Sequence, residues 1–213
     1  MDKPIESYTE IEARLGRRTR QGFDSSCGYE LLDGLLRKVQ AACPGRLLPW
    51  TEFVDYQYTL DDGRCVRTRA VTDESACNIR AVTVHKRKVA NELLTVNPFN
   101  KQVTHVRLAR SDELEVDVNE LPHVVPTKSI TRVCIKQRAS LPDGDFRYDF
   151  TLSWEADTRE AAEAKQRDTA SAPVCYVELE YVGKEWPQDK NTLKEKLCKT
   201  IAAAINAPTV LLS

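Results

Sequence analysis

The chain has 213 residues, of which 41% are hydrophobic and 30% charged, and its formal net charge is −1. This apolar content is enough for a substantial core, and the near-cancellation of charge excludes the broad basic surface typical of non-specific nucleic-acid binding. There are seven cysteines with no Cys-x-x-Cys pair, and three histidines. We therefore expect reduced thiols, an intracellular protein and no zinc site.

The sequence predicts one domain that does not enter a membrane. No apolar run approaches the roughly 18 residues of a membrane-spanning helix. Residues 1–10 lack the apolar core of a signal peptide. No internal repeat or linker interrupts the chain, so we expect a single domain over residues 1–213.

The first predicted element is a β-strand over residues 9–16, TEIEARLG. Successive side chains of a strand point to opposite faces. Glu10, Glu12 and Arg14 therefore share one face, and the apolar residues share the other. The next segment, residues 25–43, has leucines at helical spacing. This spacing predicts an amphipathic helix that packs on the outside of a sheet.

The rest of the chain brings the number of predicted strands to eight. Two strands lie within residues 51–71, on either side of the turn signal Asp61-Asp62-Gly63. The others cover residues 80–89, 103–117, 130–140, 145–155 and 174–182, and Leu141-Pro142-Asp143-Gly144 predicts a second hairpin turn. The polar segment 157–173 predicts a solvated helix or a loop, and leucine spacing predicts a helix over residues 187–206.

Charged residues keep to one face in most of these strands. Glu178 and Glu180 share a face of one strand, and Lys136 and Arg138 share a face of another. The same alternation groups Arg67 with Arg69, Arg147 with Asp149, and Arg107 with Glu113 and Glu115, whereas Lys86 and Lys88 share a face with Val82 and Val84. Like charges this close repel one another unless opposite charges lie across from them.

An antiparallel sheet with one face in water is the ordinary explanation of such alternation. The predicted helices, however, have apolar faces that need the apolar face of a sheet as a partner. If these helices cover the outside of a curled sheet, the charged face must point inward. We therefore expect an α+β fold in which eight antiparallel strands close into a barrel with helices packed outside.

A charged barrel interior predicts a ligand. Burying an ion costs several kcal/mol unless it is well paired, so we expect a hydrated tunnel that holds a charged ligand. The basic side chains would bind an anion, and the paired glutamates would hold a hard divalent metal ion. The inward charges sum to about +1, which a divalent ion raises to about +3, close to the charge that neutralises a triphosphate.

Four motifs in chain order resemble one enzyme family. EIEARLG (residues 10–16) and VELEYVG (177–183) resemble the two glutamate-bearing strands of the triphosphate tunnel metalloenzymes. Between them, IKQR (135–138) resembles the family's basic strand and RYDFT (147–151) its Arg-x-Asp-x-Thr strand. Within the family, residues 9–182 resemble the fungal and protozoan (trypanosomatid-like) RNA 5′-triphosphatases of mRNA capping.

The resemblance implies a fold, the closed eight-stranded tunnel, and a set of site residues. The implied ligands of Mg²⁺ or Mn²⁺ are Glu10, Glu12, Glu178 and Glu180. The implied phosphate-binding residues are Arg67, Lys136, Arg138 and Arg147, with Lys86 as an addition and Arg69 as an alternative to Arg67. Arg14, which the alternation of its strand places on the inner face, is predicted to bind substrate with them. Asp149 would orient neighbouring basic side chains, and Glu113 would position the attacking water, with Glu115 as its alternative.

The implied activity is hydrolysis of the γ-phosphate of 5′-triphosphate RNA, the first step of mRNA capping, with hydrolysis of free NTPs in Mn²⁺ as a side activity. Two alternatives stay open. One is a hydrolase of inorganic tripolyphosphate, nucleoside triphosphate or thiamine triphosphate with the same fold, and the other is a non-enzymatic barrel that binds an anion. The resemblance also implies a nuclear location, nascent RNA as a partner and a capping guanylyltransferase as a second partner, although we identify no segment that would bind the latter.

Overall fold

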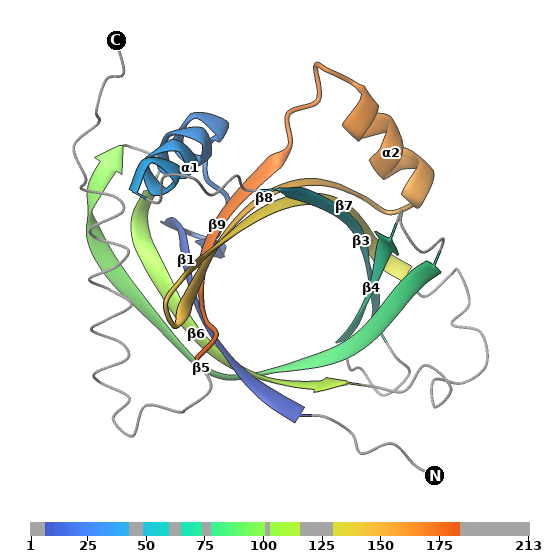
Figure 1. Ribbon diagram of the computed structural model, residues 1–213, viewed down its shortest axis with the longest axis horizontal. Helices are drawn as coiled ribbons and strands as arrows, with labels where there is room; N and C mark the ends of the chain where they lie inside the picture. Colours follow the sequence, from blue (N-terminus) through green and yellow to red (C-terminus); the bar gives the residue numbers. More distant parts are fainter. Residues whose placement is uncertain are drawn as a thin grey trace.

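The computed structural model describes residues 7–42, 49–59, 65–73, 78–100, 103–115 and 130–183. Within these stretches the elements are β1 (Ser7–Thr19), β2 (Gly22–Asp24), α1 (Tyr29–Ala42), β3 (Trp50–Thr59), β4 (Cys65–Asp73), β5 (Asn78–Asn100), β6 (Val103–Glu115), β7 (Ile130–Asp143), β8 (Phe146–Ala156), α2 (Arg159–Arg167) and β9 (Val174–Tyr181). The strands curve around a central opening, and both helices lie outside the ring (Figure 1).

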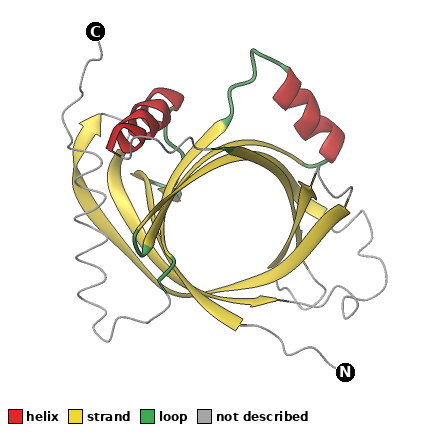
Figure 2. Ribbon diagram, in the orientation of Figure 1, coloured by secondary structure: helices red, strands yellow, loops and turns green. Residues whose placement is uncertain are grey.

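Eight of the described strands form a nearly closed antiparallel barrel, which confirms the predicted fold. In hydrogen-bonding order they run β1, β6, β5, β4, β3, β7, β8 and β9, and each neighbouring pair is antiparallel. β1 then pairs with β9, with Glu12 opposite Glu180 and Arg14 opposite Glu178, so the first and last strands of the ring meet. Figure 2 shows the strands as a ring with the two helices outside it. The short strand β2 adds a hairpin partner to β1.

The main hydrophobic core lies outside the barrel, between the sheet and α1. Leu31, Leu32 and Leu35 of α1 are almost completely buried there. Their neighbours are outward-facing residues of four strands: Leu15, Val106, Leu108, Phe150, Val177 and Leu179. Each large apolar side chain buried in this way stabilises the fold by roughly 1.5–3 kcal/mol. The apolar face of the sheet therefore points away from the tunnel, which leaves the polar face inside.

The polar segment after β8 contains α2, so the helical form of the prediction is confirmed. The Thr158 hydroxyl accepts a hydrogen bond from the backbone N–H of Ala161 (3.2 Å) and caps the helix. Ala162 is completely buried and packs with Val133 and Ile135 of β7. The helix thus covers part of the outside of the barrel through a small apolar contact.

The first helix is shorter than predicted. It begins at Tyr29 rather than at residue 25. The backbone N–H of Cys27 donates a hydrogen bond to the carbonyl of Cys175 on β9 (2.8 Å). This bridge to β9, together with the two hydrogen bonds that Ser26 donates to the Asp24 carboxylate (3.0 and 2.6 Å), occupies the residues in which an earlier helical turn would have formed.

The strand predicted over residues 80–89 is part of a much longer one. β5 runs from Asn78 to Asn100 and has a register shift between Lys88 and Ala90. A bulge of this kind inserts an extra residue and turns side chains out of the regular alternation. Val89 is accordingly exposed.

Both predicted hairpins are consistent with the strand pairing. Gly144 has a φ of +60° in the turn between β7 and β8, a conformation that favours glycine. β3 and β4 pair as expected, although Asp61-Asp62-Gly63 and the helix predicted over residues 187–206 lie outside the described residues. No helix in the described stretches is long and apolar enough to cross a membrane.

Replacing glycine by alanine should have opposite effects on stability at Gly16 and Gly34. A β-carbon at Gly16 would overlap the carbonyl oxygen of Asp24 and lie 2.6 Å from the Phe23 ring, whereas one at Gly34 would meet nothing within 4 Å. Gly16→Ala should therefore lower the free energy of unfolding by about 1–3 kcal/mol. Gly34→Ala should raise it by about 0.5–1 kcal/mol, because alanine is the better helix former. Urea denaturation measures both, and a neutral Gly16→Ala would contradict the close packing of β2 on β1.

Candidate functional site

Four glutamates meet where β1 and β9 close the barrel, and we call them the seam carboxylates. They are Glu10 and Glu12 of β1 with Glu178 and Glu180 of β9. Arg14 joins the two strands, because its Nη2 lies 2.8 Å from Glu12 Oε2 and its Nε lies 2.7 Å from Glu178 Oε1. Lys86 of β5 forms an ion pair with Glu10, and its Nζ lies 3.7 Å from Glu12. The predicted grouping of the two Glu-x-Glu motifs is therefore what the fold produces.

The seam carboxylates differ in their electrostatic environment. Burial alone would raise the pKa of Glu178, but Arg14 and Arg138 outweigh it and lower the pKa to about 2. Burial raises the pKa of Glu180 to about 7, because the opposing effect of Arg147 is weaker. Burial and the nearby charge of Glu12 also raise the pKa of Glu10. Negative charge at Glu10 and Glu180 is thus only partly compensated by the protein.

Asp149 of β8 organises the basic side chains beside the seam. It is almost completely buried and accepts hydrogen bonds from Arg138 Nη1 (3.0 Å), Arg147 Nε (2.9 Å) and Ser140 Oγ (2.6 Å). Arg138 also donates to Thr151 (3.0 Å) and to Glu178 (3.3 Å). Arg147 also pairs with Glu180. The predicted Arg-x-Asp-x-Thr strand and the predicted basic strand therefore form one connected network with β9.

Asp55 of β3 is a site residue that the sequence analysis missed. Its carboxylate is completely buried, accepts two hydrogen bonds from Arg69 (2.7 and 3.0 Å) and lies 2.9 Å from Lys136 Nζ. Burial alone would raise the pKa of Asp55, but the hydrogen bond from Arg69 and the charge of Lys136 hold it well below its usual range. In the sequence, the pattern that could have identified Asp55 is a single acidic residue between Val54 and Tyr56, which both lie on the apolar face of the strand.

An aromatic ring lies under two of these arginines. The guanidinium carbon of Arg69 is 4.1 Å from the centroid of the Phe53 ring, and that of Arg138 is 5.4 Å from it. Phe53 precedes Asp55 by two residues on the same face of β3. A cation over an aromatic face is stabilised by about 0.5–2 kcal/mol. Phe53 and Asp55 together therefore hold two guanidinium groups from different strands in place.

Glu113 of β6 lies inside the barrel, as predicted. Its side chain is 2% exposed, and its Oε1 lies 3.5 Å from Lys86 Nζ and 3.8 Å from Arg67 Nη2. The side chain of its alternative, Glu115, lies outside the described residues. Arg67 and its alternative Arg69 both belong to the inner network: Arg67 approaches Glu113, while Arg69 pairs with Asp55.

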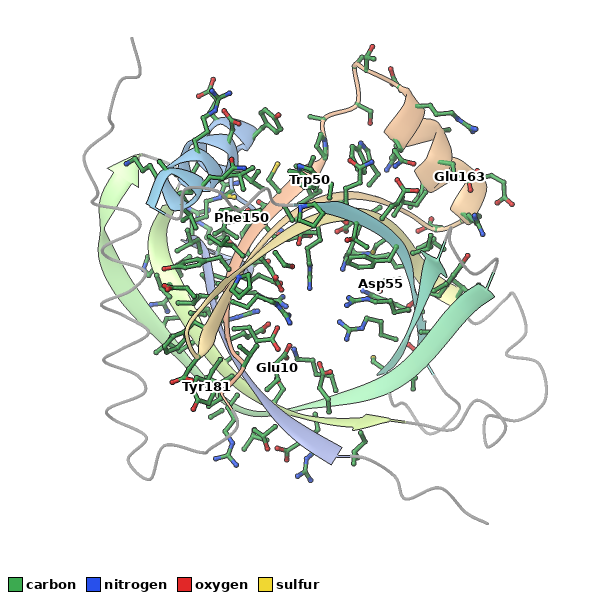
Figure 3. All side chains as sticks on the ribbon, in the orientation of Figure 1. Glu10, Trp50, Asp55, Phe150, Glu163 and Tyr181 are labelled. Atoms are coloured by element: carbon green, nitrogen blue, oxygen red, sulfur yellow. The ribbon has the colours of Figure 1, made fainter. Side chains whose placement is uncertain are left out.

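Arg107 of β6 is a second residue near the seam carboxylates that was not among the predicted site residues. Its Nη2 lies 3.8 Å from Glu12, and its guanidinium lies over the ring of Phe23 at 5.0 Å. It shares the face of Glu113 in the predicted strand, so the alternation contained the signal. In Figure 3, Glu10 and Asp55 lie on the tunnel side of the strands, whereas Glu163 of α2 lies outside the barrel.

The donor chemistry of the seam fits a hard divalent cation. All four side chains offer carboxylate oxygens, which Mg²⁺ and Mn²⁺ prefer, and Glu12 stands directly opposite Glu180 in the register. In the arrangement described here, no group of three or more His, Cys, Asp or Glu residues is assembled as a metal site. Instead, lysine and arginine side chains hold these carboxylates. A metal ion would therefore replace ion pairs that the protein makes within itself.

Comparison with known proteins supports the fold. No protein-family model matches the sequence, and no curated protein matches it. Among solved structures, the S. pombe Pct1 RNA triphosphatase has a TM-score of 0.58 at 20% identity over 95% of this chain and 80% of that chain. The same protein in complex with the Spt5 CTD has a TM-score of 0.60 at 19% identity over 95% of this chain and 80% of that chain. The RNA triphosphatase domain of the mimivirus mRNA capping enzyme has a TM-score of 0.58 at 14% identity over 92% of this chain and 89% of that chain.

These similarities establish that the chain has the triphosphate tunnel fold. They include fungal and viral proteins at low identity, so they do not select the predicted fungal or protozoan lineage.

Removing the buried charge of Asp55 should destabilise the protein. Asp55→Asn leaves Arg69 and Lys136 without their carboxylate, and we expect a loss on the order of 3 kcal/mol at pH 7. The folded pKa of Asp55 lies below its unfolded value, so the wild-type advantage is present above about pH 4 and declines as the pH falls further. Urea denaturation at pH 7 and pH 3 measures this difference. The exposed Asp157→Asn serves as the control, and an equal loss in both variants would contradict the assigned role of Asp55.

Proposed function

We propose that the protein is a metal-dependent RNA 5′-triphosphatase that releases the γ-phosphate from the 5′ end of RNA before capping. The observation that carries this proposal is the meeting of the seam carboxylates with a connected set of arginines and lysines inside one barrel. The structurally similar fungal and viral proteins are RNA triphosphatases, which supports it. A role in capping would place the protein in the nucleus, with a guanylyltransferase acting on its product.

The basic side chains would bind the triphosphate. Arg67, Arg138 and Arg147 offer planar groups that bind phosphate oxygens in pairs, and Lys86 and Lys136 offer point charges. Arg14 and Arg69 extend the same surface. Because every one of them except Arg67 lies within 3.0 Å of a carboxylate or is hydrogen-bonded to one, the groups are already oriented before a substrate arrives.

The acidic side chains would divide into two roles. Glu10, Glu12, Glu178 and Glu180 would hold Mg²⁺ or Mn²⁺, and the bound ion would polarise the phosphate and neutralise developing charge. Glu113 is buried beside Lys86 and Arg67, so it is placed to accept a hydrogen bond from the attacking water. Phosphoryl transfer needs mainly positioning and electrostatic stabilisation, which this arrangement would supply without a covalent nucleophile.

A second candidate is hydrolysis of inorganic tripolyphosphate or free nucleoside triphosphate. One observation favours this candidate. The side chains described inside the barrel are mainly arginines, lysines and carboxylates, and such charged groups would recognise phosphates and a metal ion but not a base. The third candidate, an anion-binding barrel without catalysis, would have little use for two glutamate pairs, since their charge opposes anion binding unless a cation is present.

Phosphate release separates these candidates. We expect release from 5′-triphosphate RNA in Mg²⁺ or Mn²⁺ but not in EDTA, slower release from ATP, and a fall in kcat on the order of 100-fold in Glu12→Gln and Glu178→Gln. Glu163→Gln, on the outer helix α2, is the matched control and should retain wild-type activity. Unchanged release in both seam variants would overturn the assigned site. Turnover of tripolyphosphate alone would establish the second candidate, and binding without any turnover would establish the third.

The aromatic support under the arginines makes a separate prediction. Phe53→Leu removes the ring that contacts Arg69 and Arg138, and the loss of about 1 kcal/mol should raise the KM for tripolyphosphate about fivefold. Phe150→Leu removes a buried ring from the outer core and should lower the melting temperature without changing KM. Steady-state kinetics at a temperature where both variants are folded measures the difference. An equal rise in KM in the two variants would show that Phe53 contributes only packing and does not support the arginines.

A further inference from the structure

The two ends of the barrel carry different groups. Because neighbouring strands are antiparallel throughout the ring, the last residues of β1 share an end with the first residues of β6, β7 and β9. We call it the hairpin end, since β1 continues there into β2. Glu10 and Glu180 lie toward the opposite end, near the start of β1 and the close of β9.

The hairpin at this end is well ordered by its own contacts. Arg17 stands opposite Asp24 and pairs with it at 3.1 Å. The Thr19 hydroxyl donates to the carbonyl of Gly22 (2.9 Å), and Gly22 has a φ of +124°, which favours glycine. The hairpin, residues 17–24, is therefore a fixed projection and not a loose loop.

One face of the hairpin continues the tunnel wall. Arg18 stands opposite Phe23, and antiparallel partners present their side chains to the same face. Phe23 lies under Arg107, which in turn lies 3.8 Å from Glu12 inside the barrel. Arg18 also follows Glu10, Glu12 and Arg14 in the alternation of β1. A continuous surface therefore leads from the seam carboxylates out to Arg18.

The charge along this surface changes sign from inside to outside. Glu10 and Glu12 are carboxylates, whereas Arg14 and Arg18 are cations. Arg18 and Arg20 are exposed, and no ion pair with an acidic side chain is found for either of them within the described residues. Both guanidinium groups are thus available for a polyanion that leaves the tunnel at this end.

We propose that the hairpin end receives the body of a single-stranded RNA whose 5′-triphosphate occupies the barrel. This inference rests on the proposed function and adds to it the direction in which the substrate lies. Arg18 and Arg20 would contact the phosphates next to the triphosphate, and the Phe23–Arg107 pair would mark the passage between tunnel and hairpin. Such contacts depend on charge and not on base sequence, so binding should be sequence-independent and sensitive to salt.

The test is a double charge reversal, Arg18→Glu with Arg20→Glu. With 5′-triphosphate RNA we expect the KM to rise about tenfold and the slope of log K against log salt to fall by about 0.7 for each lost contact. Inorganic tripolyphosphate has no RNA body, so its KM and kcat should stay within about twofold of wild type. The matched control reverses two exposed arginines elsewhere, Arg37→Glu on α1 with Arg87→Glu on β5, and changes the net charge by the same amount.

Fluorescence anisotropy with a labelled triphosphate RNA measures the same difference without turnover. If wild type binds this RNA but hydrolyses nothing, the proposed activity fails while a selective loss of binding in the hairpin variant still supports this inference. Equal effects of the two double variants on RNA would overturn it, because the effect would then be one of overall charge. An unchanged KM, affinity and salt slope in the hairpin variant would also overturn it, since the RNA would have to lie at the other end.

Discussion

The structure depends on the pairing of charges that face the inside of a nearly closed sheet. A carboxylate or a guanidinium removed from water costs several kcal/mol unless an opposite charge and hydrogen bonds compensate. Asp149 accepts four hydrogen bonds from the side chains of Arg138, Arg147 and Ser140, and Asp55 is held by two cations from neighbouring strands. The strand register is therefore set from inside as well as outside, because a one-residue slip would turn every charge to the wrong face.

The apolar face of the same strands points away from the tunnel. It packs outward against α1, so the barrel has its hydrophobic core on the outside and its polar network on the inside. This inversion explains why the chain needs helices at all. Without them the outer face would remain a wide apolar surface in water, and the inner face alone would contribute little net stability, since ion pairs roughly offset their own desolvation.

In this interior, the charges of a ligand and a metal ion would replace ion pairs that the protein makes within itself. Arg14, Lys86 and Arg147 are held by the seam carboxylates, so the protein satisfies its charges without a ligand. A phosphate chain and a divalent cation would provide the same charges in a different arrangement, with phosphate on the bases and metal on the acids. If these side chains bind a ligand as proposed, the ion pairs that already hold them would limit the conformational entropy lost on binding. In a channel with limited access to water, fixed charges act more strongly than they do in bulk solvent.

The sequence by itself determined which side chains could face inward. The alternation of Glu10 with Glu12, of Glu178 with Glu180 and of Lys136 with Arg138 required a polar face, and the amphipathic helices required that this face be enclosed. What the alternation could not reveal was which charge meets which, because ion pairing is decided by strand register and ring closure over residues far apart in the chain. Asp55 was missed for that reason, because a single acid in a strand has no visible partner until Arg69 and Lys136 approach it from other strands. The alternation placed Arg107 on the inner face with Glu113, but its approach to Glu12 depends on the neighbouring strand β1. The tertiary structure alone decided these partners, since the energy of a charge pair depends on a distance that no local pattern contains.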